Sequence, residues 1–173
     1  DQPALVCRFL EIEHEATMAR AAVLAEAGVD VICRNGFYET TDFWSPAQLA
    51  AWVAPRLREQ IEVMRSGGAA VIYTVESGIM PLLDYLDALP FDGYQAIEPA
   101  LGHQDMRQVA ARLGTRHALW GGVSAPLHLG EGSPAVARQA VREAFAVCGR
   151  RGLVLSAVPS IRAHWPWENA LAM

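Results

Sequence analysis

Six apolar runs punctuate the chain, and most of them are continuous rather than alternating with polar residues. They occupy residues 4–10, 29–37, 69–75, 93–99, 116–123 and 152–158. Continuous apolar runs are typical of strands that are covered on both faces, because alternation arises where one face meets water. The pattern therefore predicts six parallel strands at the centre of the fold.

Helical segments lie between these runs. Apolar positions at helical spacing predict helices over residues 15–28, 45–68, 77–89, 104–114 and 133–149, and a short last helix over 166–173. The second helix has a clear start, since Ser45 precedes Pro46 and Gln48 is placed for a capping box. Pro55 is expected to kink this helix or to divide it into two.

The order of strands and helices predicts an α/β fold with parallel strands joined by right-handed crossovers. No strand is followed by G-x-G-x-x-G, so a dinucleotide-binding fold has no support from a motif. We expect a (βα)8 barrel of the TIM type, of which six βα units are present. Residues 1–173 then form a single domain that belongs to a longer polypeptide, or a partner covers its open edges; we expect the first.

Composition narrows the classes of partner. The chain of 173 residues is 52% hydrophobic, which is enough for a core, and its net charge of −5 argues against a nucleic acid as main partner. No apolar run reaches the roughly 18–20 residues that span a bilayer. Three dispersed cysteines without a C-x-x-C pair favour a reduced cytoplasmic setting. The absence of lysine excludes a lysine Schiff base within this chain.

In a barrel, functional residues collect at the carboxyl ends of the strands. Several predicted strands end in polar side chains, and we expect these to converge on one rim. The candidate catalytic residues are Glu76, Glu98 and His164. The candidate substrate-binding residues are Arg34, Asn35, Tyr38, Ser124 and Arg162.

Structural roles compete with these functional ones. Glu76 or Ser77 could cap the helix that follows, and Glu98 could do the same for its own helix. Arg34 and Asn35 could merely shape the turn after their strand. No H-x-C or C-x-x-C pair stands at a strand end and no G-x-S-x-G occurs, so we expect neither a metal site nor a serine nucleophile.

Residues 45–78, 92–141 and 152–173 resemble the uroporphyrinogen decarboxylase superfamily. The matching positions are Ser45-Pro46, Pro55, Gly78, 121–124 (Gly-Gly-Val-Ser), 132–134 (Gly-Ser-Pro) and 166–169 (Pro-Trp-Glu-Asn). Their order and spacing agree over nearly the whole chain. The resemblance implies a (βα)8 barrel of which this chain corresponds to the carboxyl-terminal two thirds.

This superfamily also contains corrinoid-dependent methyltransferases, whose thiol-specific members carry His-x-Cys and a later cysteine as zinc ligands. At the corresponding positions this chain has Val75 and Ser77, and the later cysteine falls near Val158 or Pro159. The resemblance therefore implies no zinc and no cofactor held by this chain, with any corrinoid supplied by a partner protein. The decarboxylases have a histidine on the last strand, which would also fall near Val158, although His164 lies six residues beyond.

The activity that we expect is a lyase of the uroporphyrinogen decarboxylase type, which removes a carboxylate from an anionic tetrapyrrole at the rim of the strands. The first alternative is a zinc-independent methyltransferase that works with a corrinoid protein. The aromatic loop over residues 34–46 resembles this branch more closely. The second alternative is a degenerate paralogue that only binds. The partners expected are a small-molecule substrate, the corrinoid protein of the first alternative, and a second copy in a homodimer.

Overall fold

The computed structural model of the chain describes residues 2–173. Five parallel strands form one sheet in the order β1-β2-β3-β4-β5. Their bounds are β1 (Val31–Asn35), β2 (Ala70–Thr74), β3 (Gly93–Ile97), β4 (Ala118–Ser124) and β5 (Leu153–Val158). Strands that neighbour each other in sequence also neighbour each other in the sheet, as in the wall of a (βα) barrel. The predicted α/β fold of barrel type is confirmed.

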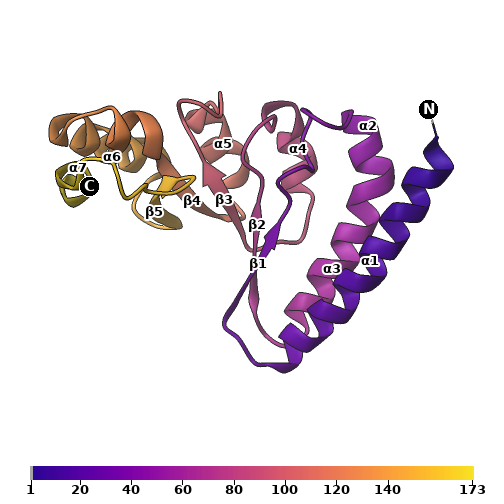
Figure 1. Cartoon of the computed structure of the whole chain (residues 1–173). Helices are drawn as coiled ribbons and strands as arrows, with labels where there is room; N and C mark the ends of the chain where they lie inside the picture. Colours follow the sequence, from indigo (N-terminus) through magenta and orange to yellow (C-terminus); the bar gives the residue numbers. More distant parts are fainter. Residues whose placement is uncertain (1) are drawn as a thin grey trace.

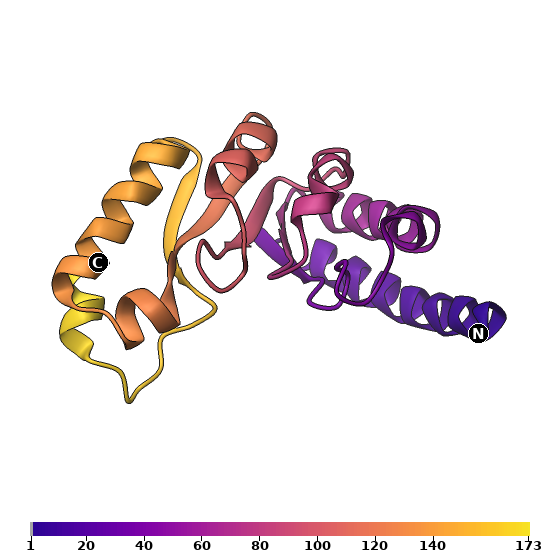
Figure 2. The ribbon, with the colours of Figure 1, turned by 90° about the horizontal axis from the view of Figure 1, so that it is seen from above.

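Helices cover the outer side of the curved sheet, from α1 beside α3 at one end to α6 at the other (Figures 1 and 2). The longer ones are α1 (Pro3–Glu26), α3 (Ala54–Arg65), α5 (Met106–Leu113) and α6 (Pro134–Cys148). The shorter ones are α2 (Pro46–Gln48), η1 (Leu49–Val53), η2 (Met80–Leu82), α4 (Leu83–Asp87), η3 (Ala125–Gly130) and α7 (Trp167–Ala172). No helix in the described part combines the length and the apolar character that a membrane crossing requires.

The strand predicted over residues 4–10 is wrong, because these residues form the first turns of α1. Pro3 stands at the start of this helix, and neither glycine nor proline follows it before Gly28. A short apolar run has no periodicity that separates a strand from a helix. The run is also not covered on both faces, since Phe9 is 65% exposed. The sheet therefore has five described strands rather than six.

The start of the second predicted helix agrees with the sequence. Ser45 Oγ accepts a hydrogen bond from the Gln48 amide at 3.2 Å, and Gln48 Oε1 accepts one from the Ser45 amide at 2.9 Å. This is the predicted capping box. The expected division also occurs, because the π-helical turn η1 separates α2 from α3 just before Pro55. The proline carries no amide hydrogen, so a regular helix could not continue through this point without losing a bond.

The two faces of the sheet have different surroundings. The outer face packs its larger side chains, such as Tyr73, Tyr94 and Leu119, against the helices in the main hydrophobic core. Because side chains alternate along a strand and paired residues share a face, the concave face carries the intervening positions. One row of that face consists of Asn35, Thr74, Gln95, Trp120 and Val154. The concave face therefore holds polar groups where the outer face holds core residues.

Candidate functional site

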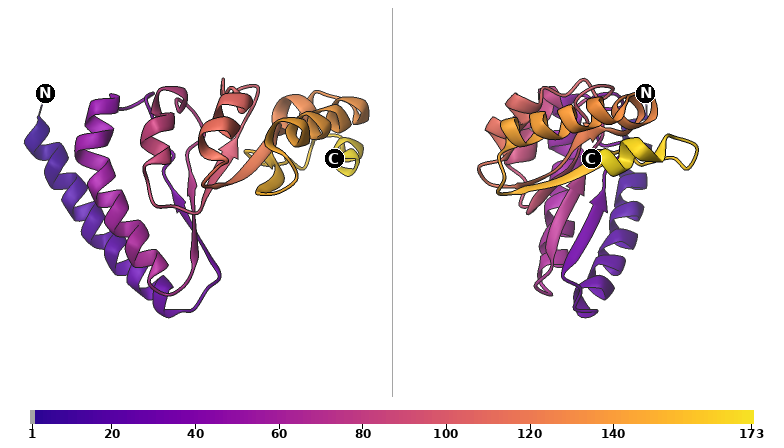
Figure 3. Two further views of the ribbon diagram at one scale, coloured as in Figure 1. Left: turned by 180° about the vertical axis from the view of Figure 1, so that it is seen from behind. Right: turned by 90° about the vertical axis from the view of Figure 1, so that its left-hand side faces the viewer.

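A pocket of about 220 Å³, which we call the rim pocket, lies at the carboxyl ends of the strands on the concave face. Its lining residues are Asn35, Phe37, Thr74, Glu76, Gln95, Ala96, Ser156, Ala157, Val158 and Pro159. β1 and β5 are the opposite edges of the sheet, yet residues that end or follow both strands line it. Residues at the two edges can line one pocket because the sheet is curved. The ribbon is seen from above in Figure 2, and from behind and from one side in Figure 3.

Most polar groups of the rim pocket come from or follow three adjacent strands, and Ser156 of β5 adds a hydroxyl. Asn35, Thr74 and Gln95 occupy one row of the sheet. Thr74 Oγ1 donates to Gln95 Oε1 at 2.7 Å, and this bond fixes the Gln95 amide so that its NH2 group can donate to a ligand. Glu76 is the one ionisable side chain among the described residues that line the pocket. A ligand here would meet amides, hydroxyls and a single carboxylate.

The capping roles considered for Glu76 and Ser77 are not what the structure shows. The helical segment after β2 begins at η2, whose capping position is Ile79 and has no side-chain cap. Ser77 Oγ donates instead to Asp42 Oδ2 at 2.5 Å, which ties the end of β2 to the loop after β1. Glu76 lies two residues beyond Thr74 and faces the same side of the sheet. Of the eight predicted residues, Glu76 and Asn35 meet in the rim pocket.

Glu98 does not line the rim pocket, and it does not cap the next helix either, because Asp105 caps α5. The Glu98 side chain is buried, and Oε2 accepts hydrogen bonds from the amides of Ala100 at 3.1 Å and Gly102 at 2.5 Å. The carboxylate therefore caps the turn that follows β3. Oε1 is buried without a hydrogen-bond partner among residues 2–173.

The other predicted residues at the ends of β4 and β5 are also not in the rim pocket. Ser124 is fully buried and caps η3, with its hydroxyl accepting from the Leu127 amide at 3.5 Å. Arg162 and His164 are exposed in the loop that follows β5. The His164 ring lies edge-on to Trp165, with 5.9 Å between the ring centroids. These three residues therefore do not line the pocket that Glu76 lines.

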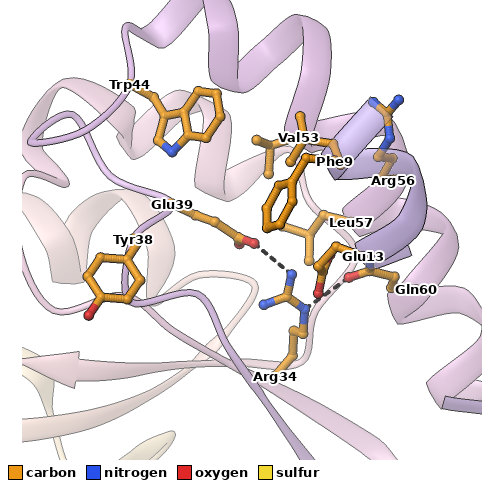
Figure 4. Close-up of a pocket in the computed structure, with 11 residues that line it drawn as sticks. Phe9, Glu13, Arg34, Tyr38, Glu39, Trp44, Val53, Arg56, Leu57 and Gln60 are labelled. Carbon is orange, nitrogen blue, oxygen red and sulfur yellow. Dashed lines mark hydrogen bonds and ion pairs between the residues drawn. The ribbon is translucent and has the colours of Figure 1, made fainter. Parts of the chain in front are cut away.

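Arg34 and Tyr38 line a different cavity, of about 170 Å³, between α1, α3 and the loop after β1. Figure 4 shows Arg34 reaching towards Glu39 and Gln60, while Tyr38 points away from them. Arg34 Nε donates to Gln60 Oε1 at 2.9 Å, and its Nη2 donates to Glu39 Oε1 at 2.6 Å. Arg34 pairs with Tyr73 in the sheet, so both face the helices and not the rim pocket.

Burial and the charge of Glu39 shift the pKa values of Arg34 and Tyr73. Burial alone would lower the pKa of Arg34, but the adjacent Glu39 carboxylate holds that pKa above its usual value. Burial, followed by the charge of Glu39, raises the pKa of Tyr73 well above its usual value. Tyr73 therefore stays protonated and donates to Glu39 Oε2 at 2.5 Å. Arg34 and Tyr73 act here as structural partners of one carboxylate.

Thr74 and Gln95 were not among the sequence-based candidates. Both lie inside predicted strands, whereas the candidates lie at the ends of strands or in the loops that follow them. A signal was present, because each is a polar residue that follows a tyrosine within an apolar run. Polar residues inside a strand that is otherwise apolar point to a face that does not join the core.

A zinc site of the kind found in the thiol methyltransferases does not fit these residues. Val75 is a fully buried apolar side chain, and the Ser77 hydroxyl is engaged with Asp42. No group of three or more histidine, cysteine, aspartate or glutamate residues is placed to hold a metal ion within residues 2–173. Catalytic zinc requires three such ligands. No step of a reaction is therefore assigned to zinc.

The fold of this chain is similar to that of a solved protein structure. A solved structure of a methyltransferase from Methanosarcina mazei is similar, with a TM-score of 0.73 and 24% sequence identity. The match covers 94% of this chain and 45% of the methyltransferase, so the chain spans less than half the length of that protein. A search of curated proteins found no match. The family model for uroporphyrinogen decarboxylase (URO-D) matches residues 1–173, and the chain therefore belongs to the URO-D family.

Proposed function

We propose that the rim pocket serves a methyltransferase that acts on a small substrate, uncharged or cationic, in partnership with a corrinoid protein. The observation that carries this proposal is the charge of the pocket lining. Glu76 contributes a carboxylate, and the remaining polar side chains are amides and hydroxyls. A few convergent polar groups of this kind fix the orientation of a small ligand.

Decarboxylation of a tetrapyrrole would need the opposite charge. A substrate with several carboxylates is held by arginines or other cationic groups that form charge-assisted hydrogen bonds. Arg34 is paired with Glu39 on the helix side, and Arg162 lies in an exposed loop. A substrate carboxylate about 4 Å from Glu76 would be repelled by about 4 kcal/mol at the effective dielectric constant typical of protein surfaces.

The residues of the pocket suit methyl transfer in separate ways. The Glu76 carboxylate would pair with a cationic donor, whose nitrogen leaves as a neutral amine when the methyl group moves to the corrinoid. For an alcohol, Glu76 would instead act as a general acid that gives a proton to the oxygen that leaves. The Gln95 amide, fixed by Thr74, would orient the polar end of the substrate. Phe37 would cover the apolar methyl side, and its ring face would attract a cation. In this proposal a corrinoid bound to the partner protein supplies the methyl-accepting chemistry.

Formation of methylcobalamin tests the proposal. The purified protein is incubated with cob(I)alamin and a panel of methanol, methylamines and tetramethylammonium, and the absorbance change on methylation is followed. We expect turnover with at least one donor and a loss of about 10²-fold or more in Glu76→Gln. Glu62→Gln, which removes an exposed carboxylate of α3, is the matched control and should keep full turnover. Equal rates in the two variants would contradict a role for Glu76.

The family model favours a second candidate, decarboxylation of uroporphyrinogen. It is tested by incubating the same protein with uroporphyrinogen III and measuring coproporphyrinogen and CO2. Our proposal expects neither product. Formation of coproporphyrinogen would overturn the methyltransferase proposal and support the lyase. Inactivity in both assays would support the binding-only paralogue.

A further inference from the structure

The buried amide side chain of Gln104 lies directly behind the main chain of Glu76. We infer that Gln104 is a positioning residue, which fixes the backbone of Glu76 so that its carboxylate faces the rim pocket. The inference rests on the proposed role of Glu76 in that pocket. Gln104 Nε2 donates to the Glu76 carbonyl at 2.9 Å and to the Ala96 carbonyl at 3.0 Å. Both hydrogens of the amide are thereby used.

These two bonds join strands beyond the point where their own pairing ends. The last paired residues of β2 and β3 are Thr74 and Gln95. The Glu76 and Ala96 carbonyls come after this pair, and the side chain of Gln104 links them in place of a backbone bond. Gln104 is 3% exposed, so the loss of these two hydrogen bonds would be costly because water does not take their place. The Gln104 side chain thus holds the Glu76 carbonyl in place.

A second bond fixes the preceding carbonyl. The Tyr94 hydroxyl, fully buried, donates to the Val75 carbonyl at 2.7 Å and lies 3.5 Å from Gln104 Oε1. Two successive carbonyls are therefore held from the same side, and the peptide plane between Val75 and Glu76 cannot rotate freely. The direction of the Glu76 side chain follows from this plane.

The loop after β3 delivers Gln104 to this place. Glu98 Oε2 accepts from the amide of Gly102, which draws the loop inward. A Cβ atom at Gly102 would lie 2.9 Å from the Glu98 carbonyl oxygen and 3.1 Å from that of Glu76, so glycine permits the close approach. On the other side, Asp105 caps α5 by accepting from the Arg107 and Gln108 amides. Gln104 is held between these two fixed points, and Glu98 acts on the pocket only through this loop.

A matched pair of variants separates positioning from simple stability. Gln104→Met removes both bonds while keeping a side chain of similar size. Gln60→Met is the control, because Gln60 is also buried and hydrogen-bonded through both ends of its amide, to Arg34 and His14 on the helix side. We expect both variants to lose similar stability in urea.

The readout is the 13C NMR signal of the Glu76 carbonyl and carboxyl groups, assigned by comparison with Glu76→Gln. Both signals should move in Gln104→Met, the carbonyl upfield because it loses its donor, and both should stay in place in Gln60→Met. Unmoved signals in Gln104→Met would overturn the inference. If Gln104→Met does not fold, Gly102→Ala decides, because it keeps the amide but pushes the loop away. Unmoved Glu76 signals in Gly102→Ala would then overturn the inference.

Turnover provides a separate arm. In the methyl-transfer assay, Gln104→Met should lower the rate by about 10- to 100-fold, as expected for misplacement of a reacting group by about 1 Å. The same change in a Glu76→Gln background should have no further effect, because Gln104 acts through Glu76. Additive losses in the double variant would overturn the inference. If the NMR signals of Glu76 move as expected but no methyl transfer is detected, the proposed function is refuted and the positioning role of Gln104 is retained.

Discussion

The Arg34 guanidinium offers a sharp test of whether a strand-end arginine binds substrate or holds the fold. In the structure it donates to Gln60, to Glu39 and to the backbone carbonyl of Asn35. Its two side-chain partners, Gln60 and Glu39, line the helix-side cavity and not the rim pocket. Arg34→Met removes these bonds and the positive charge but keeps an apolar stem of similar length. The Glu39 carboxylate then keeps the Tyr73 hydroxyl as donor and loses its cation.

The expected loss follows from the burial of the pair. The side chains of Arg34 and Glu39 are 11% and 19% exposed, so water screens them weakly. Removing one partner of a buried ion pair costs about 3–5 kcal/mol, because the other charge is left without compensation. The remaining exposure and the bond from Tyr73 place Arg34→Met near the lower end, at about 3 kcal/mol. This is a large part of the roughly 5–15 kcal/mol that stabilises a domain.

Urea unfolding followed by circular dichroism measures this loss. Arg8→Met is the matched control, because Arg8 pairs with Glu11 at 3.2 Å while both side chains are about half exposed or more. Exposed pairs contribute about 1 kcal/mol or less. Equal stability losses in the two variants would refute the structural role of Arg34. Arg34→Met with full stability but weakened donor binding would instead support the substrate-binding role predicted from the sequence.

Two further predictions concern stability. Asn169→Ala removes the donor to the carbonyls of Leu129 at 2.8 Å and Gly132 at 3.0 Å, so it should lower the free energy of unfolding in urea by about 2–3 kcal/mol. Glu168→Ala, which changes an exposed neighbour, is the control and should lower it by less than about 0.5 kcal/mol. The pKa of Tyr73 is raised by burial, so the unfolded chain loses this proton first and stability should fall as pH rises above about 10. Tyr73→Phe should flatten this fall, and identical slopes would contradict the buried hydroxyl.

The sequence predicts the fold well where local signals agree with one another. Five of the six apolar runs contain strands, and the capping box at Ser45 and the break before Pro55 occur as expected. The failure at residues 4–10 has a simple physical cause. An apolar run that continues into a helix without glycine or proline favours one long helix, and burial cannot be read from hydrophobicity alone.

The site is harder to predict because neighbouring residues on a strand face opposite sides. Arg34 and Asn35 are adjacent in sequence, yet one joins the helix-side pocket and the other the rim pocket. The pocket that each residue joins depends on which face of β1 is buried. Ile32 packs into the core and so fixes the buried face. A five-residue strand with apolar residues on both faces does not reveal this phase, and a shift of one residue would exchange the two roles.

The two glutamates show most clearly what decides between a site and a structural cap. Glu76 follows Thr74 by two residues, so simple alternation places both on the concave face. On β3, counting by twos fails, because Ala96 forms a bulge with φ of 89° that shifts the register with β4. Ile97 then turns into the core, the strand ends, and the Glu98 carboxylate meets the amides of its own turn. The turn after β3, whose amides bind the Glu98 carboxylate, therefore leaves one carboxylate at the rim where the sequence offers two. Chemistry that needs paired carboxylates requires the second one at the rim, and Glu98 does not line that pocket. Among the described residues, the rim pocket therefore offers one carboxylate, that of Glu76, together with amides and hydroxyls.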